Sequence, residues 1–373
     1  MIFKLDVYYN FTRRKYVFVD YLMDINEVKN KEELLLKFDI WYNTFRVEKS
    51  RERVKNNKIE RVLTYYNVEP LLIGSKYKYE KCINELYYAI YFKEIDRIKA
   101  CINVVNECIE DNNYLKPLFT MFRIYAHMNI GNDINEIYEM VSDDLKYIMK
   151  FKKNYFINEY EIIFESIKHG LYKVDNLLKL NRLANEYKSL KWIYLSAAGT
   201  TYYFKEEDEK VISIYEELVE DFTFHNNTER LMIAYSNICY SYNKLRRFSK
   251  CIEVTEKCLP IIYSGRKSVW IDNVLLHYIY ANYAIEKYDT IVNMFTTPIF
   301  NSDRFFWVTA FICILAANKI NQINRAQFII DKFKDDANIN LLLRYINEKN
   351  IKILYDVKML SYIPDIIQKL KHR

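Results

Sequence analysis

A spacing of 40 residues recurs through the middle of the chain. Its clearest unit runs from Ala234 to Leu259, where small and apolar residues at helical spacing lead into a polar turn and a second run of the same kind. Gly199, Cys239 and Ile279 occupy the same place in successive units, 40 residues apart. A pair of short helices cannot bury its apolar face alone, so the pattern requires neighbouring pairs to stack.

These helical pairs resemble tetratricopeptide repeats, in which a small residue of the first helix lets the second helix pack closely. In the third unit Ile291 takes the place of Cys251. A fourth unit, with Ala326 in that place, follows at a shorter spacing of 35 residues. The resemblance implies a right-handed α-solenoid with a concave inner face.

Glycine and proline are scarce, with five of each in 373 residues. Sandwiches, barrels and dinucleotide-binding sheets need many tight turns, which these two residues supply. Their scarcity favours helices joined by short polar loops, and we predict an all-α fold. Apolar residues alternate within residues 1–30, which fits either a β-hairpin around residues 10–14 or a helix.

The seven cysteines include no C-x-x-C pair and are odd in number. We interpret them as buried core thiols in a reducing compartment. The five histidines are isolated, and the sequence has no metal-binding spacing and no glycine-rich phosphate loop. We therefore predict no metal, no cofactor and no enzymatic activity.

Apolar runs in the chain fall short of the roughly 20 residues that a membrane-spanning helix needs. The first residues also lack the pattern of a cleavable leader, in which a small-residue site follows an apolar run. We expect a cytoplasmic protein without membrane association.

Basic residues are concentrated between Trp41 and Arg61. This segment contains seven lysines and arginines against three acidic residues, a net charge of +4, whereas the whole chain carries +6. Such a concentration is typical of a surface that contacts nucleic acid, and it also occurs on the solvated face of a helical bundle.

Residues 31–72 predict three helices with breaks at Asp39-Ile40 and at Asn56-Asn57. In the middle helix we expect Phe45 and Val47 to pack inward. We expect its outward face to carry Tyr42, Asn43, Arg46 and Lys49. A further amphipathic helix over residues 59–66 is closed by the apolar residues of 68–72.

This arrangement resembles the helix-turn-helix of repressor-type DNA-binding proteins. Glu32-Glu33-Leu34 matches the start of that motif. Phe38-Asp39-Ile40 stands where the family has a Leu-Gly-Val turn, and Asn67-Val68 stands where it has a closing Gly-Val. Asp and Asn tolerate a left-handed backbone best after glycine, so both turns stay possible. The bulky Trp41-Tyr42 pair departs from the family pattern, which has small polar residues there.

The resemblance implies a DNA-binding domain over residues 1–75. A recognition helix lies in the major groove with its first residues toward the base edges. Arginine pairs with guanine and asparagine with adenine, while basic residues that neutralise phosphates make binding salt-dependent. The residues predicted to bind DNA are Trp41, Tyr42, Asn43, Arg46, Lys49, Arg51, Arg53 and Lys55.

A repressor-like unit followed by degenerate repeats resembles the peptide-pheromone receptors of low-GC Gram-positive bacteria and their phages (the RRNPP superfamily), and most of all the arbitrium receptors. The resemblance covers nearly the whole chain at the level of pattern. It implies a homodimeric regulator of phage lysogeny in the bacterial host cytoplasm, with operator DNA and a short signalling peptide as partners. The solenoid would span residues 76–350, and residues 351–373 would form a capping or dimerisation helix.

Receptors of this superfamily hold the peptide backbone with asparagines of inner helices, because a carboxamide both donates and accepts hydrogen bonds. Asn237 matches such a position best, and the other residues come from the equivalent inner-face region. The predicted peptide-binding set is Asn237, Asn243, Tyr202, Thr200, Lys191, Asn273 and Tyr280.

A second class of function stays open. Phosphatase-regulating (Rap-like) receptors share the repeats but replace the DNA-binding unit with a helical bundle, and residues 38–46 also resemble the Trp-Tyr-x-x-Ile-Arg start of that bundle. Such a protein would sequester or dephosphorylate a response regulator under peptide control, without DNA binding. The basic residues of 46–61, and the lack of a glutamine where the catalytic one would fall, favour DNA binding.

Overall fold

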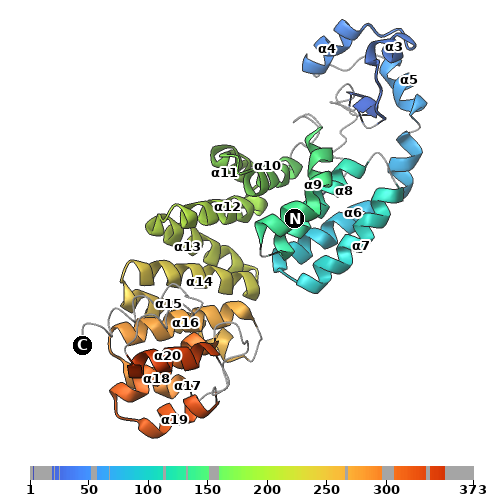
Figure 1. Cartoon of the computed structure of the whole chain (residues 1–373). Coiled ribbons are helices and arrows are strands. Elements are labelled where there is room, and N and C mark those ends of the chain that lie inside the picture. Colours follow the sequence, from blue (N-terminus) through green and yellow to red (C-terminus); the bar gives the residue numbers. More distant parts are fainter. Residues whose placement is uncertain are drawn as a thin grey trace. The chain divides into compact units, whose positions relative to one another are not determined.

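The computed structural model of the chain consists of helices (Figure 1). It describes residues 3, 19–20, 22–24, 26–51, 57–66, 68–111, 115–131, 133–150, 159–264, 268–295, 306–332 and 337–348. Within these ranges every regular element is helical, which confirms the all-α prediction. The chain divides into two compact units, residues 1–197 and residues 198–373.

The first unit begins with short helices and continues with longer ones that pack in pairs. Residues 19–20 and 22–24 are helical, while the hairpin considered around residues 10–14 lies outside the described residues. The unit contains α3 (Lys31–Leu36), α4 (Tyr42–Arg51), α5 (Asn57–Tyr65), α6 (Val68–Phe92), α7 (Ile95–Asp111), α8 (Lys116–Ile130), α9 (Ile134–Met149), α10 (Glu159–Tyr172), α11 (Leu177–Glu186) and a 3₁₀ turn (Lys188–Leu190). Helix α6 runs through residue 75, and the division into units comes later, within α12 (Lys191–Phe204).

The second unit is built from helical pairs. Its helices are α13 (Asp208–Phe224), α14 (Thr228–Lys244), α15 (Phe248–Ile262), α16 (Val269–Ala284), α17 (Tyr288–Phe295), α18 (Phe306–Lys319), α19 (Ile323–Lys332) and α20 (Ala337–Glu348). Helix α14 packs against α15 and α16, and α16 packs in turn against α17 and α18. The first helices of successive pairs are therefore neighbours. The capping helix predicted over residues 351–373 lies outside the described residues.

The turns between paired helices repeat the sequence spacing. Glu206, Arg246 and Glu286 each adopt a positive φ of 57–65° and lie 40 residues apart, and Asn321 follows after 35 residues with φ 56°. In each turn the next residue donates its N–H to the carbonyl five residues back, as in Arg247 to Tyr242 at 2.8 Å. This hydrogen bond closes a helix end with a left-handed residue. The predicted spacings of 40, 40 and 35 residues are confirmed as helical pairs.

Small residues allow the paired helices to approach closely. A Cβ at Gly199 would meet the ring of Tyr215 on α13 at 2.8 Å. Cys239 of α14 is fully buried, and its Sγ lies 3.4 Å from Oγ1 of Thr255 on α15. All seven cysteines are free and buried, which confirms their interpretation as core thiols.

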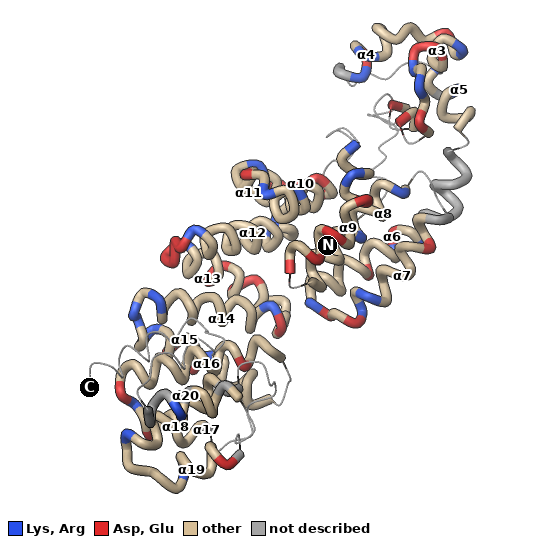
Figure 2. Tube along the Cα trace, in the orientation of Figure 1, with Lys and Arg blue, Asp and Glu red and all other residues tan. Residues whose placement is uncertain are grey.

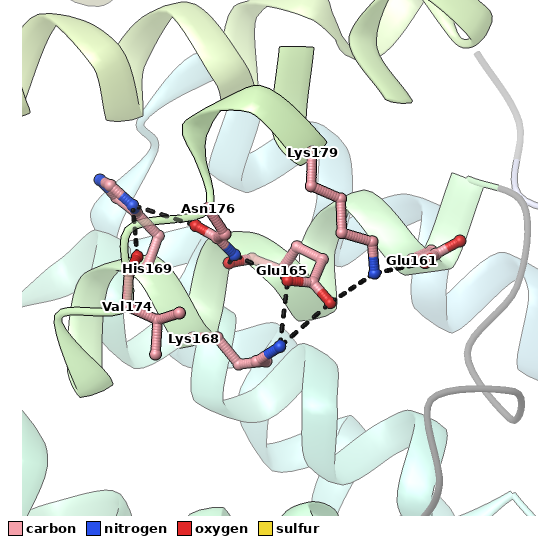
Figure 3. Close-up of polar contacts among 7 residues, drawn as sticks. All are labelled: Glu161, Glu165, Lys168, His169, Val174, Asn176 and Lys179. Atoms are coloured by element: carbon pink, nitrogen blue, oxygen red, sulfur yellow. Dashed lines mark hydrogen bonds and ion pairs between the residues drawn. The ribbon is translucent and has the colours of Figure 1, made fainter. Parts of the chain in front are cut away.

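A buried carboxylate ties α10 to α11 in the first unit (Figure 3). Glu165 is 1% exposed and accepts hydrogen bonds from Lys179 and Asn176, both at 2.7 Å, and from Lys168 at 3.1 Å. Burial acts to raise the pKa of Glu165, but these hydrogen bonds outweigh it and hold the pKa below its ordinary value. Lys179 also pairs with Glu161 at 2.6 Å, so the charges of this cluster balance.

Candidate nucleic-acid interface and peptide site

Helices α3 and α4 are joined by a tight turn. The side chain of Asn30 caps α3 by accepting from the N–H of Glu33 at 3.1 Å, and Leu34 and Leu35 are buried. Asp39 has φ 53°, and the N–H of Ile40 donates to the carbonyl of Leu35 at 3.0 Å. The left-handed residue predicted at Asp39 is therefore present, and it ends α3 so that α4 can leave in a new direction.

Helix α4 has a buried side and an exposed side. Phe45 is 1% exposed and anchors the helix, whereas Asn43 and Arg46 are exposed. Trp41, just before the helix, is 70% exposed, and Tyr42 is partly buried. The start of α4 and the residue before it thus present three exposed residues to solvent, an aromatic, an amide and an arginine.

Two orientations predicted for α4 are wrong. The sequence predicts that Val47 packs inward, but this residue is 43% exposed. It also predicts that Lys49 faces outward, but the amine of Lys49 pairs with Asp20 at 2.6 Å. The helical period explains both results. Lys49 follows Phe45 by four residues and shares its face, while Val47 follows by two and lies on the opposite side.

Asp20 links the helices of this region. Its buried carboxylate pairs with Lys49 of α4 at 2.6 Å and with Lys31 of α3 at 2.9 Å, and Lys31 also pairs with Asp24. Burial acts to raise the pKa of Asp20, but the hydrogen bonds from Lys49 and Lys31 dominate and lower it. Lys49 is thus committed to an internal ion pair and contributes less to the exposed charge of α4 than the sequence predicted.

The other basic residues of this segment differ in their surroundings, and two of the predicted DNA contacts lie outside the described residues. Lys58 of α5 donates to the carbonyl of Asp39 at 2.9 Å, so it helps to hold the turn. Arg51 ends α4, and Figure 2 marks the basic positions along this helix. Arg53 and Lys55 lie outside the described residues.

Some of the predicted peptide-binding residues reach the surface. Asn237 and Asn273 are partly exposed on α14 and α16, and Thr200 is exposed on α12. The amide of Asn237 donates to the carbonyl of Ile233 on its own helix at 2.8 Å. Tyr202 is partly exposed, with the amine of Lys210 over its ring. Lys191, also partly exposed, belongs to the first unit.

Asn243 and Tyr280, by contrast, are both 3% exposed. The amide of Asn243 donates to the carbonyl of His277 at 3.0 Å, and this hydrogen bond joins α14 to α16. The ring of Tyr280 packs edge-on against Phe248 with centroids 6.0 Å apart. As folded here, these two side chains join helices and present almost no surface to a ligand.

His277 is a buried residue outside the predicted peptide-binding set. It follows Asn237 by one 40-residue repeat, so the same register could have identified it. Its ring lies 5.9 Å from that of Tyr240, which in turn lies 5.3 Å from Tyr203. Nε2 of His277 is 3.5 Å from the hydroxyl of Ser236. Burial lowers the pKa of His277 to about 3, so the ring is neutral at physiological pH.

The chain matches no protein-family model, no curated protein and no solved structure. The part of the chain that the structure describes brings together no cluster of three or more metal-binding side chains. Among the same residues, no helix is both long and apolar enough to cross a bilayer.

Proposed function

We propose that the chain is a peptide-responsive DNA-binding regulator. The observation that carries this proposal is the turn at Asp39, which releases α4 with Phe45 inward and with Trp41, Asn43 and Arg46 toward solvent. A recognition helix needs these properties, because its base-reading side chains must be free while its opposite face is fixed. In this proposal α3, the turn and α4 form a helix-turn-helix, and Arg46 and Asn43 read bases.

The exposure of Trp41 supports this function over a phosphatase-regulating bundle. An aromatic residue that served as packing in a helical bundle would be covered, whereas Trp41 keeps 70% of its surface exposed. In this proposal the exposed indole before the first turn of α4 contacts a thymine methyl or the sugar-phosphate backbone.

The peptide-responsive part of the proposal rests on the helical pairs of the second unit. We interpret these pairs as a right-handed solenoid in which α14 and α16 contribute to an inner face. Asn237 and Asn273 are partly exposed residues of these helices, and carboxamides suit an extended peptide that cannot satisfy its own backbone amides. A homodimer that binds an operator in two half-sites completes the proposed function.

An electrophoretic mobility shift tests the DNA-binding part. The full chain is titrated onto the DNA directly upstream of its own gene, with Arg46→Ala and Asn43→Ala as variants. We expect a sequence-specific shift that both variants weaken while their folding is unchanged. The absence of a sequence-specific shift at every salt concentration would remove the regulator proposal.

A further inference from the structure

Phe3 is inserted into an aromatic pocket of the first unit. Its side chain is fully buried, and its ring lies edge-on to Tyr87 at 5.0 Å and to Phe122 at 5.4 Å between centroids. A third ring, that of Tyr160, lies 5.2 Å away. Edge-to-face contacts of this kind favour an aromatic occupant over an aliphatic one.

The backbone of Phe3 is held by a side chain far away in the sequence. Its N–H donates to Oδ1 of Asn84 at 2.7 Å, and its carbonyl accepts from Nδ2 of the same residue at 3.0 Å. A carboxamide that pairs with both groups of one residue contacts the main chain as a neighbouring strand would. Nδ2 of Asn84 also donates to the carbonyl of Glu80 at 2.7 Å, which fixes the direction of the carboxamide.

The pocket is assembled by contacts that do not involve Phe3. Tyr87 lies on α6, Phe122 on α8 and Tyr160 on α10, and α8 packs directly against both α6 and α10. The hydroxyl of Tyr87 accepts from Nε1 of Trp192 at 3.0 Å. The walls are therefore oriented by their own helices, and the site combines a main-chain clamp with a side-chain pocket, the two elements of peptide recognition.

We propose that Asn84, Tyr87, Phe122 and Tyr160 form a binding site for an extended peptide that contains phenylalanine, and that Phe3 occupies this site in cis. A peptide of the same chemistry supplied in trans competes with Phe3 for the pocket. This site lies in the first unit and is distinct from the inner face proposed for α14 and α16, and the proposal does not depend on DNA binding.

Fluorescence anisotropy with a labelled hexapeptide of residues 1–6, Met-Ile-Phe-Lys-Leu-Asp, tests the proposal on the full chain. Phe3→Ala empties the pocket, so we expect this variant to bind the peptide at least ~10-fold more tightly than the wild-type chain, in which Phe3 competes. Two altered peptides probe the contacts: one has alanine in place of phenylalanine, and the other is N-methylated at the phenylalanine and lacks its N–H. We expect each to bind at least ~10-fold more weakly than the parent peptide.

Asn84→Ala in the Phe3→Ala background removes the clamp and should weaken peptide binding by ~10-fold or more. Asn129→Ala is the matched control, because Asn129 donates to the carbonyl four residues back on α8 as Asn84 does on α6. We expect this control to leave peptide affinity unchanged. Equal losses from both substitutions would indicate that general helix stability, and not the clamp, governs binding.

The proposal is overturned if a folded Phe3→Ala variant binds the parent and alanine peptides equally well, or binds neither of them. Should Phe3→Ala fail to fold, Phe3→Leu is the second variant, since leucine retains much of the buried volume but not the edge-on ring contacts. In that background the parent peptide should again bind at least ~10-fold more tightly than to the wild-type chain. Equal affinity for the two chains would identify Phe3 as an ordinary core residue.

Discussion

The residues predicted to bind DNA on α4 and those predicted to bind a peptide in the second unit differ in how many of them are exposed to solvent. In the N-terminal half of α4, Asn43 and Arg46 are exposed as the sequence predicts. In the second unit, Asn237 and Asn273 reach the surface, whereas Asn243 and Tyr280 are buried between helices. The difference follows from the number of neighbours. Helix α4 is covered on one side, while α14 and α16 are covered by helices of their own pair and of adjacent pairs.

A polar residue in the second unit can therefore be either a joint between helices or part of a ligand surface, and residue type alone does not distinguish the two. Position in the repeat does not distinguish them either. Asn237 and His277 share one register and lie one repeat apart, yet the first is partly exposed and the second is buried. Substitutions along this register test where the surface ends and the joints begin.

The largest expected effect is the pH dependence contributed by His277. Burial lowers the pKa of this side chain to about 3 in the folded state, while the unfolded chain titrates near 6.5. The unfolded state therefore binds a proton first as the pH falls. Below pH ~6.5 the contribution of His277 to the free energy of unfolding should decrease by about 1.4 kcal/mol per pH unit until pH ~3.

Chemical denaturation of the wild-type chain and of His277→Gln between pH 7 and pH 5 measures this contribution. We expect the glutamine variant to lose less stability than the wild-type chain over the interval, by about 2 kcal/mol. His225→Gln is the control, because the side chain of His225 at the C-terminal end of α13 is 48% exposed. If His277→Gln retains the full pH dependence of stability, then His277 is accessible to solvent in the folded chain. The difference in burial between His277 and Asn237 would then not hold.

Asn243→Ala gives the next effect. The substitution removes the hydrogen bond to the carbonyl of His277 and leaves that buried acceptor without this donor. We expect a loss of ~1–3 kcal/mol in the free energy of unfolding. Urea denaturation at pH 7 measures it. A fully stable Asn243→Ala variant would show that Asn243 does not stabilise the contact between α14 and α16. Asn243 would then again be a candidate for contacting the peptide.

Arg46→Ala tests the proposed DNA contact of an exposed residue of α4. We expect DNA affinity to fall by ~1–3 kcal/mol, about tenfold or more, with no change in thermal stability, because the guanidinium is exposed. Arg46→Lys retains the charge but loses the planar fork. It should therefore keep the salt dependence of the affinity and lose discrimination between bases, as measured by mobility shifts on matched and mutated operators.

Lys49→Met is compared with Arg46→Ala, because Lys49 lies on the same helix but is ion-paired within the protein. Because the amine of Lys49 is paired with Asp20, its loss should leave the slope of affinity against salt unchanged. Arg46→Ala should reduce that slope by about one phosphate contact if Arg46 touches the backbone as well as a base. A reduced slope for Lys49→Met would mean that the pair with Asp20 opens when DNA binds.

The sequence predicts much of this fold for identifiable reasons. The spacings of 40 and 35 residues predict the helical pairs because small and apolar residues recur at the same place in each unit, and the structure ends the first helix of each pair at the same spacings with left-handed residues such as Arg246 and Asn321. The turn at Asp39 is predicted because Asp tolerates a left-handed backbone where the related motif has glycine. The sequence does not predict the roles of Lys49 and Phe3, because no local pattern specifies partners so far along the chain. Lys49 pairs with Asp20, 29 residues away, and Phe3 pairs with Asn84, 81 residues away.

The smallest expected effect is that of Asn237→Ala on stability. Among the residues that the structure describes, the side-chain amide donates to the carbonyl of Ile233, which already accepts within the same helix, and Asn237 is partly exposed. We therefore expect a change of less than ~0.5 kcal/mol in the free energy of unfolding, within the usual range for surface positions. Urea denaturation beside Asn243→Ala measures the contrast directly. If Asn237→Ala costs as much as Asn243→Ala, both asparagines are joints between helices, and the repeat face has lost its best candidate for holding a peptide backbone.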